Sequence, residues 1–163
     1  MKFRDAQQKD LPVIVAIYNS TIEGRMVTAD VTPVSVESKQ QWFNEHSSDK
    51  HPLWIVEDEN ETIVGWVSFQ AFYGRPAYDA TAEISIYLEP LERGKGYGKK
   101  ILQYAMQEAP SFGITTLLGF IFAHNEPSLE LFYKLGFEEW GHLKNIANLD
   151  GVARSLKILG VRL

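Results

Sequence analysis

Residues 81–109 have the sequence TAEISIYLEPLERGKGYGKKILQYAMQEA, and this stretch decides the fold. Residues 81–88 alternate between aliphatic and other side chains, which is the period of a β-strand, with Glu83 on the non-aliphatic face. After Gly98 the apolar residues recur every three or four positions, which predicts an α-helix. The stretch therefore combines a strand, a glycine-rich turn and a helix that begins directly after the turn.

The turn combines a permissive backbone with positive charge. Its sequence, RGKGYGKK at 93–100, places glycine at alternate positions and surrounds the glycines with arginine and lysine. Because glycine has no Cβ, several backbone N–H groups can point at one small anion. The start of the helix adds unpaired N–H groups and the positive end of its dipole. This pattern predicts a phosphate or pyrophosphate site. The alternative is an ordinary strand-to-helix connection with surface lysines.

The spacing of the glycines distinguishes between phosphate ligands. A P-loop requires Ser or Thr after its lysine, and here Lys99 is followed by another lysine. A dinucleotide-binding turn requires Gly-x-Gly-x-x-Gly, and here the third glycine comes one residue early. The spacing that fits is Arg/Gln-x-x-Gly-x-Gly/Ala, supplied by Arg93, Gly96 and Gly98. This is the acyl-CoA signature of the GNAT superfamily of N-acetyltransferases, which the chain resembles.

Composition limits the class of protein. At 163 residues, with 45% hydrophobic and 23% charged residues, we expect one soluble domain spanning 1–163. A net charge of −5 argues against nucleic acid as a partner. The absence of cysteine excludes disulfides, thiolate metal sites and a cysteine acyl-enzyme. The histidine spacing predicts no metal site. A polar N-terminus and the lack of a long apolar run predict a cytoplasmic protein without membrane contact.

Hydrophobic periodicity predicts the order βααβββαβαββ along the chain. The first helix is expected to start after Asp10 as N-cap and to stop at Gly24. The predicted strands are 2–6, 53–57, 62–72, 81–88, 115–123 and two antiparallel strands within 137–163 around a turn at Leu149-Asp150-Gly151. The other predicted helices are 36–45, 98–109 and 126–135. This order describes an α/β fold with a mixed, mostly antiparallel sheet and helices on both faces. It is also the order of the GNAT fold, which the chain resembles over nearly its whole length.

Within that superfamily the chain is most similar to the phosphinothricin or methionine sulfone acetyltransferase branch. The matching segments are Ile17–Asn19, Met26–Asp30, Arg75–Tyr78, Thr81-x-Glu83 and His124–Ser128. The resemblance implies acetyl-CoA as co-substrate and acetylation of the α-amine of a small L-amino-acid-like substrate. Acceptors of the phosphinothricin, methionine sulfoximine or methionine sulfone type are implied. Two alternatives stay open: acetylation of a protein N-terminus or a polyamine, and a catalytically silent CoA-binding module.

The resemblance also assigns residues to the co-substrate. The turn would hold the pyrophosphate through the backbone of Arg93, Gly94, Lys95, Gly96, Tyr97, Gly98 and Lys99. The backbone of Ile86, Tyr87 and Leu88 would pair with the pantetheine arm and supply the oxyanion donor. Asn125 and Ser128 would contact the pantetheine or thiol end. For Asn125, a helix cap is the equally weighted alternative.

The same resemblance assigns the chemistry at the acceptor. Glu83 corresponds to the general base, and partial burial is expected to raise its pKa. Phe132 stands where many relatives have a tyrosine general acid, which leaves water or Tyr87 as proton donor. Arg75 and Tyr78 would bind the acceptor's anionic group, and the loop Met26, Val27 and Thr28 would cover its side chain. Homodimers are common in this family, and Phe137 and Trp140 are candidates for the contact surface.

Overall fold

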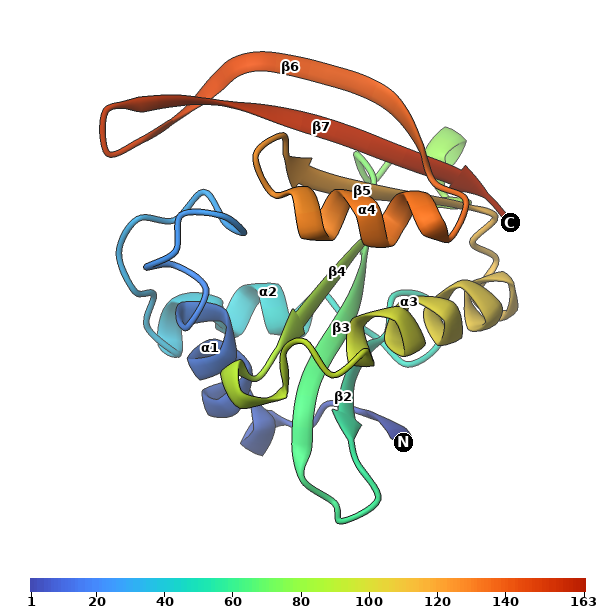
Figure 1. Ribbon diagram of the computed structural model, residues 1–163. Coiled ribbons are helices and arrows are strands. Elements are labelled where there is room, and N and C mark those ends of the chain that lie inside the picture. Colours follow the sequence, from blue (N-terminus) through green and yellow to red (C-terminus); the bar gives the residue numbers. More distant parts are fainter.

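A seven-stranded sheet in the order β1-β2-β3-β4-β5-β7-β6 is the centre of the computed structural model, which describes residues 1–163 (Figure 1). Its strands are β1 (Lys2–Asp5), β2 (Leu53–Glu57), β3 (Ile63–Ala71), β4 (Thr81–Leu88), β5 (Thr116–Phe122), β6 (Glu138–Leu149) and β7 (Val152–Arg162). The α-helices are α1 (Leu11–Asn19), α2 (Gln40–Asn44), α3 (Tyr97–Glu108) and α4 (Glu126–Lys134). Neighbouring strands are antiparallel except β4 and β5, which are parallel. The predicted α/β fold with a mixed, mostly antiparallel sheet is confirmed.

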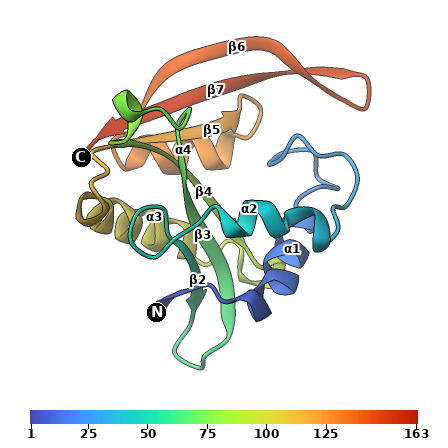
Figure 2. The same cartoon turned by 180° about the vertical axis from the view of Figure 1, so that it is seen from behind.

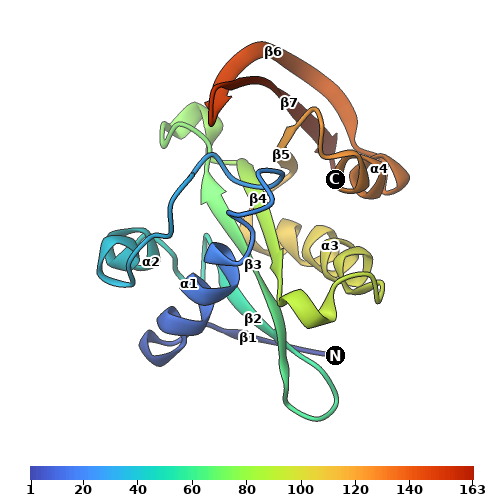
Figure 3. The same ribbon diagram turned by 60° about the vertical axis from the view of Figure 1, so that its left-hand side comes forward.

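Helices cover both faces of the sheet, with α1 and α2 on one side and α3 and α4 on the other (Figure 3). The side chains of each central strand alternate between these two sides. On β3, Val67 and Phe69 join the larger core cluster with residues of α3, whereas Trp66 packs with residues of α1. Strand β3 therefore contributes side chains to the hydrophobic clusters on both sides of the sheet. None of the helices combines the length and apolar character needed to cross a membrane.

Asp10 directly precedes α1, as predicted, but its side chain does not cap the helix. The buried carboxylate accepts hydrogen bonds from the backbone N–H of Gln7 at 2.7 Å and from Arg4 at 2.8 and 3.0 Å. Arg4 also donates to Glu57 at 2.7 Å, so the cluster joins β1, β2 and the start of α1. The Arg4 guanidinium holds the pKa of Asp10 below its ordinary value. The expected N-cap is right in position, but its carboxylate bonds to Arg4 and to the N–H of Gln7 and not to the N–H groups of α1.

The first helix ends at Asn19, before the predicted stop at Gly24. The side-chain amide of Asn19 exchanges two hydrogen bonds of 2.9 Å with the backbone of Val34. This contact folds the following loop back onto the end of α1. Residues 20–24 continue as turns, and Thr21 donates its hydroxyl to the carbonyl of Tyr18 at 2.7 Å. A polar contact far along the chain thus ends the helix, which local periodicity does not report.

The parallel strands β4 and β5 pair only at their beginnings. Their register runs from Thr81 opposite Thr116 to Glu83 opposite Leu118. Beyond Glu83, β4 stays paired with β3 on one side and has no strand on its other side, whereas β5 remains paired with β7. The two strands therefore diverge. Backbone groups along the free side of β4 are left for an extended ligand to pair with.

The C-terminal segment forms the predicted antiparallel hairpin, β6 and β7, around a turn at Asp150 and Gly151 (Figure 2). Arg25, in the loop after α1, pairs with Asp150 at 2.6 Å and so contacts the tip of the hairpin. Phe137, predicted as a candidate surface residue, is 2% exposed and belongs to the core. Trp140 is 45% exposed. Of the two aromatic residues predicted for a contact surface, only Trp140 is therefore available to a partner.

Candidate active site

The divergence of β4 and β5 leaves a groove of about 160 Å³ between them, here called the β4–β5 groove. Helix α4 and the start of α3 form its other walls. Six of the residues predicted to bind the co-substrate line this groove: Ile86, Tyr87, Leu88, Gly98, Asn125 and Ser128. The other lining residues are Val27, Ile84, Ser85, Phe120, Ile121, Leu131 and Phe132. The groove is mostly apolar, with the unpaired side of β4 along one wall. It therefore suits an extended chain that carries amide groups.

The glycine-rich turn lies at the start of α3, beside the groove. Gly94 and Gly96 have positive φ angles of 75° and 83°, which side-chain-bearing residues rarely adopt. The backbone N–H groups from Gly94 through Lys99 have no acceptor within the protein, and α3 has no side-chain cap. A run of unpaired N–H groups at a helix N-terminus is a site for an anion such as pyrophosphate. The backbone thus fits the phosphate ligand predicted from the sequence.

Several side chains of this turn bond or pack within the protein, whereas most of its backbone N–H groups stay unpaired. Arg93 folds back to donate to the carbonyl of Leu88 at 3.2 and 3.3 Å and to the hydroxyl of Ser20 at 2.8 Å. Lys95 pairs with Glu92 at 3.0 Å, and Tyr97 packs against the core. Arg93 therefore fixes the turn to the end of β4. Lys99 and Lys100 are exposed and have no carboxylate partner, so they carry the mobile positive charge.

Asn125 caps α4 and also lines the β4–β5 groove. Its Oδ1 accepts a hydrogen bond from the backbone N–H of Ser128 at 3.3 Å, and the side chain is almost fully buried. Its Nδ2 has no partner in the protein. The cap uses only the oxygen, which leaves the amide nitrogen as a donor for a ligand. The two interpretations of Asn125 are therefore compatible.

A second cavity of about 230 Å³ lies on the α1 side of β4 and is here called the aromatic pocket. Four aromatic rings line it, from Tyr18, Trp42, Trp66 and Tyr87. Trp66 stacks on Tyr87 with centroids 4.5 Å apart, and Trp42 and Tyr18 flank this pair at 5.5 and 5.3 Å. Ser85 and Tyr87 line both the pocket and the β4–β5 groove. Strand β4 is therefore the common wall of the two cavities.

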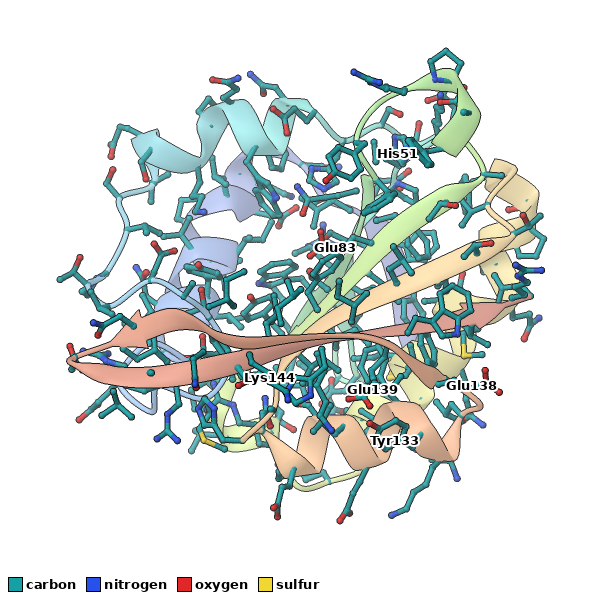
Figure 4. The ribbon with its side chains drawn as sticks, turned by 90° about the horizontal axis from the view of Figure 1, so that it is seen from above. His51, Glu83, Tyr133, Glu138, Glu139 and Lys144 are labelled. Atoms are coloured by element: carbon teal, nitrogen blue, oxygen red, sulfur yellow. The ribbon has the colours of Figure 1, made fainter.

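Glu83 lies in this common wall, on the side of the aromatic pocket (Figure 4). It stands opposite Gln70 in the register of β3 and β4. Its carboxylate has no hydrogen-bond or ion-pair partner in the protein. Burial raises the pKa of Glu83. Nearby in the same pocket, the hydroxyl of Ser68 is buried without a partner, so the polar end of the pocket has unused hydrogen-bonding capacity.

The residues predicted to bind the acceptor are not all brought together. Arg75 and Tyr78 are exposed and line neither cavity, and Tyr78 packs on Phe72 with ring centroids 5.5 Å apart. Val27 lines the β4–β5 groove, Met26 lines neither cavity, and Thr28 is buried. The Thr28 hydroxyl bonds to that of Tyr18 at 2.5 Å. The loop 26–28 thus reaches the site through Val27 and through the Tyr18 contact.

The structure also adds residues that the sequence did not single out as site residues. The pocket-lining residues in this group include Lys39, Trp42, Trp66, Ser68 and Gln70. The alternation of Trp66, Ser68 and Gln70 along β3 puts them on one face, and this pattern was visible in the sequence. No sequence signal marks Lys39, because it meets the pocket only through the packing of α2 beside α1. No group of three or more acidic or histidine side chains is arranged to hold a metal ion.

Phe132, at the position of the usual tyrosine acid, lines the β4–β5 groove. Its ring packs on Phe137 at 4.7 Å and lies over Gly119, where an added Cβ would approach it to 2.8 Å. Tyr133 points to the C-terminal hairpin and away from the groove, and it is 40% exposed (Figure 4). Neither residue therefore offers a hydroxyl to the groove. Tyr87, on strand β4 between the two cavities, lines both of them.

Two cavities that share β4, with a run of unpaired N–H groups beside one and a half-buried, unpaired carboxylate in the other, are the arrangement expected of an acyl-CoA-dependent transferase. The sequence profile of the Acetyltransferase (GNAT) family matches residues 15–137, and the chain belongs to this family. It is an N-acetyltransferase with acetyl-CoA as co-substrate.

Individual relatives agree with this class. A Bacillus subtilis protein named "Putative phosphinothricin acetyltransferase YwnH" is 53% identical over 160 residues, covering 98% of both chains. An L-methionine sulfoximine/L-methionine sulfone acetyltransferase of Pseudomonas paraeruginosa is 30% identical, covering 91% of this chain and 86% of its own. The crystal structure of a Sinorhizobium meliloti phosphinothricin acetyltransferase in complex with acetyl-CoA superposes with a TM-score of 0.91 at 29% identity, covering 99% of this chain and 88% of that one.

Proposed function

We propose that the protein acetylates the α-amine of a small L-amino-acid-like substrate by direct transfer from acetyl-CoA, with Glu83 as general base. Phosphinothricin, methionine sulfoximine and methionine sulfone are the acceptors that the names of its relatives suggest. The observation that carries the proposal is the unpaired carboxylate of Glu83 in the wall between the two cavities. There it can take a proton from an amine that approaches the thioester across β4.

The chain's own groups supply three functions. The N–H groups from Gly94 through Lys99 bind the pyrophosphate, and Lys99 and Lys100 add charge around it. The free side of β4 at residues 86–88 pairs with the pantetheine amides, and an N–H group there stabilises the oxyanion. Glu83 accepts the amine proton, directly or through water. The new C–N bond then forms at the thioester carbon as the C–S bond breaks and CoA thiolate leaves.

A proton must finally reach that thiolate. Phe132 has no hydroxyl to donate, so Tyr87 and water are the proposed donors. Burial raises the pKa of Tyr87, which keeps its hydroxyl protonated at neutral pH but also makes it a weaker acid. Water is a still weaker acid, but it can enter the groove as the products separate and relay a proton from bulk solvent.

A thiol-release assay with a panel of amines tests the acceptor class. We expect acetyl-CoA-dependent release with L-methionine sulfone, L-methionine sulfoximine and L-phosphinothricin, and none with spermidine or a peptide with a free N-terminal alanine. Reaction with the polyamine or the peptide alone would favour those alternative acceptors. If none of these amines reacts while acetyl-CoA still raises the melting temperature, the result would contradict the proposed acceptor class and favour the CoA-binding module.

We also infer that two copies associate in the cytoplasm, where acetyl-CoA is available, through the hairpin of β6 and β7. Its outward side chains include Trp140, Leu143, Ile146 and Val152, which are 38–60% exposed. Such an exposed apolar row favours contact with another protein surface. Ile146→Asp is expected to shift a dimer to monomer in sedimentation equilibrium, with a circular dichroism spectrum that shows the monomer still folded. A wild type that sediments as a monomer at all concentrations would contradict the inference.

A further inference from the structure

Only two charged residues line the aromatic pocket, Glu83 and Lys39. Lys39 is the last residue of the 3₁₀ helix η2 (Glu37–Lys39) and directly precedes α2. It is partly buried, and no carboxylate lies within 4.0 Å of its ammonium group. Its Nζ makes no hydrogen bond within the protein. The pocket therefore contains an unpaired base and an unpaired cation at separate points of its wall.

The position of the Lys39 ammonium group is fixed by an aromatic ring and not by a counter-ion. Nζ lies 4.9 Å from the centroid of the Tyr18 ring, which is a cation–π contact. The hydroxyl of Tyr18 is bonded to Thr28 and Asp30, which holds the ring in place. Burial and the bond to Asp30 raise the pKa of Tyr18 to about 12, so the ring stays neutral under Lys39. The Asp30 carboxylate is thereby used by Tyr18 and does not neutralise Lys39.

A cation on a ring face satisfies only part of its bonding capacity. The ammonium group has three N–H donors, and the π face of Tyr18 can satisfy at most those that point toward it. The others face the pocket or solvent. A carboxylate that entered the pocket would pair with Lys39 at short range in surroundings drier than the protein surface, where such pairs are stronger.

We propose that Lys39 binds the carboxylate of the acceptor and thereby makes the enzyme selective for amines that carry an anionic group. The inference rests on the proposed function. An α-amino acid has its ammonium and carboxylate groups on one carbon, with the side chain leading away. With the amine toward Glu83 and the carboxylate toward Lys39, the side chain meets the rings of Trp42 and Trp66, against which its methylene and methyl groups can pack. Lys39 then binds the acceptor's anionic group, the role that the sequence analysis gave to Arg75. Arg75 lies outside both cavities.

The test compares L-methionine sulfone with its carboxamide, which keeps the amine and side chain but lacks the negative charge. The wild type is expected to prefer the acid by about 10- to 100-fold in kcat/KM, the usual range for one charge-assisted contact. Lys39→Met removes the cation and keeps an unbranched side chain. It should raise the KM for the acid by that factor, with kcat, the KM for the carboxamide and the KM for acetyl-CoA little changed.

Two further variants make the result specific. Lys39→Arg should restore most of the preference, because it returns the charge, whereas Lys9→Met removes an exposed lysine elsewhere and should behave as wild type. If Lys39→Met keeps the preference for the acid, or if Arg75→Met abolishes it, the role of Lys39 is overturned. A wild type that acetylates acid and carboxamide equally also overturns it and leaves the transferase assignment intact. A wild type that acetylates neither counts against the proposed acceptor class itself.

Discussion

Replacing Glu83 with glutamine is expected to lower kcat by about 10²-fold or more while the affinity for acetyl-CoA is unchanged. Glutamine keeps the size and the strand position of Glu83 but cannot accept the amine proton. The β4–β5 groove and the N–H groups of the turn lie outside this change, so co-substrate binding should persist. Steady-state kinetics and acetyl-CoA titration by calorimetry measure the two quantities separately. Near-normal kcat at saturating substrate would remove Glu83 from the mechanism.

The raised pKa of Glu83 gives this prediction a pH dependence. Because burial disfavours the ionised form, kcat/KM should rise with pH through a pKa above that of an ordinary glutamate, and Glu83→Gln should lack this rise. A folded-state pKa above the unfolded value stabilises the protein below the unfolded pKa, and this contribution is lost as pH rises through the folded pKa. Above its folded-state pKa, the ionised Glu83 therefore lowers the free energy of unfolding.

Glu83→Gln should accordingly have an equal or higher melting temperature than the wild type at neutral pH. The difference should shrink as the solution is acidified through the folded-state pKa of Glu83, because the wild-type carboxyl then becomes neutral as well. Glu138→Gln, at the exposed start of β6, is the matched control and should change neither kcat nor this difference (Figure 4). A lower melting temperature for Glu83→Gln at neutral pH would show that the carboxylate has a stabilising partner.

Replacing Gly98 with valine is expected to weaken acetyl-CoA binding by about 10²-fold or more, the effect of losing one or two charge-assisted hydrogen bonds. Gly98 lies in the first turn of α3 and lines the β4–β5 groove. A Cβ there would lie 3.2 Å from Leu131 Cδ2 and 3.9 Å from Leu88 Cδ1, between the walls of the groove. The side chain would therefore occupy space beside the N–H groups that we propose to bind the pyrophosphate. Calorimetric titration with acetyl-CoA measures the loss.

The expected loss at Gly98 is steric and should not reflect unfolding. The φ angle of Gly98 is not positive, so a side chain there does not strain the backbone. Gly98→Ala should give a smaller loss of affinity than Gly98→Val, in proportion to the volume added. Gln103→Val places the same β-branched residue at an exposed position of α3 and should bind acetyl-CoA as the wild type does. Undiminished affinity in Gly98→Val would show that the diphosphate binds elsewhere.

Sequence periodicity predicted most of the fold because strands and helices are encoded locally. The strand at residues 81–88 and the hairpin around Asp150 and Gly151 were correct, since side-chain alternation and turn residues specify both directly. The helix end predicted at Gly24 was wrong. It depends on a contact of Asn19 with Val34, which no local pattern reports. The N-cap predicted at Asp10 missed Arg4 for the same reason.

By itself, the sequence determined the family, the glycine-rich turn at 93–98 and the acidic residue on the central strand, because each depends on residues that are neighbours along the chain. Only the tertiary structure decided how the site is assembled. It shows where β4 and β5 separate, it turns the Arg93 side chain back onto Leu88, and it places Lys39 in the aromatic pocket and Arg75 outside both cavities. The physical reason is that a cavity and its charges arise from side chains far apart in sequence, whose meeting depends on how the layers pack.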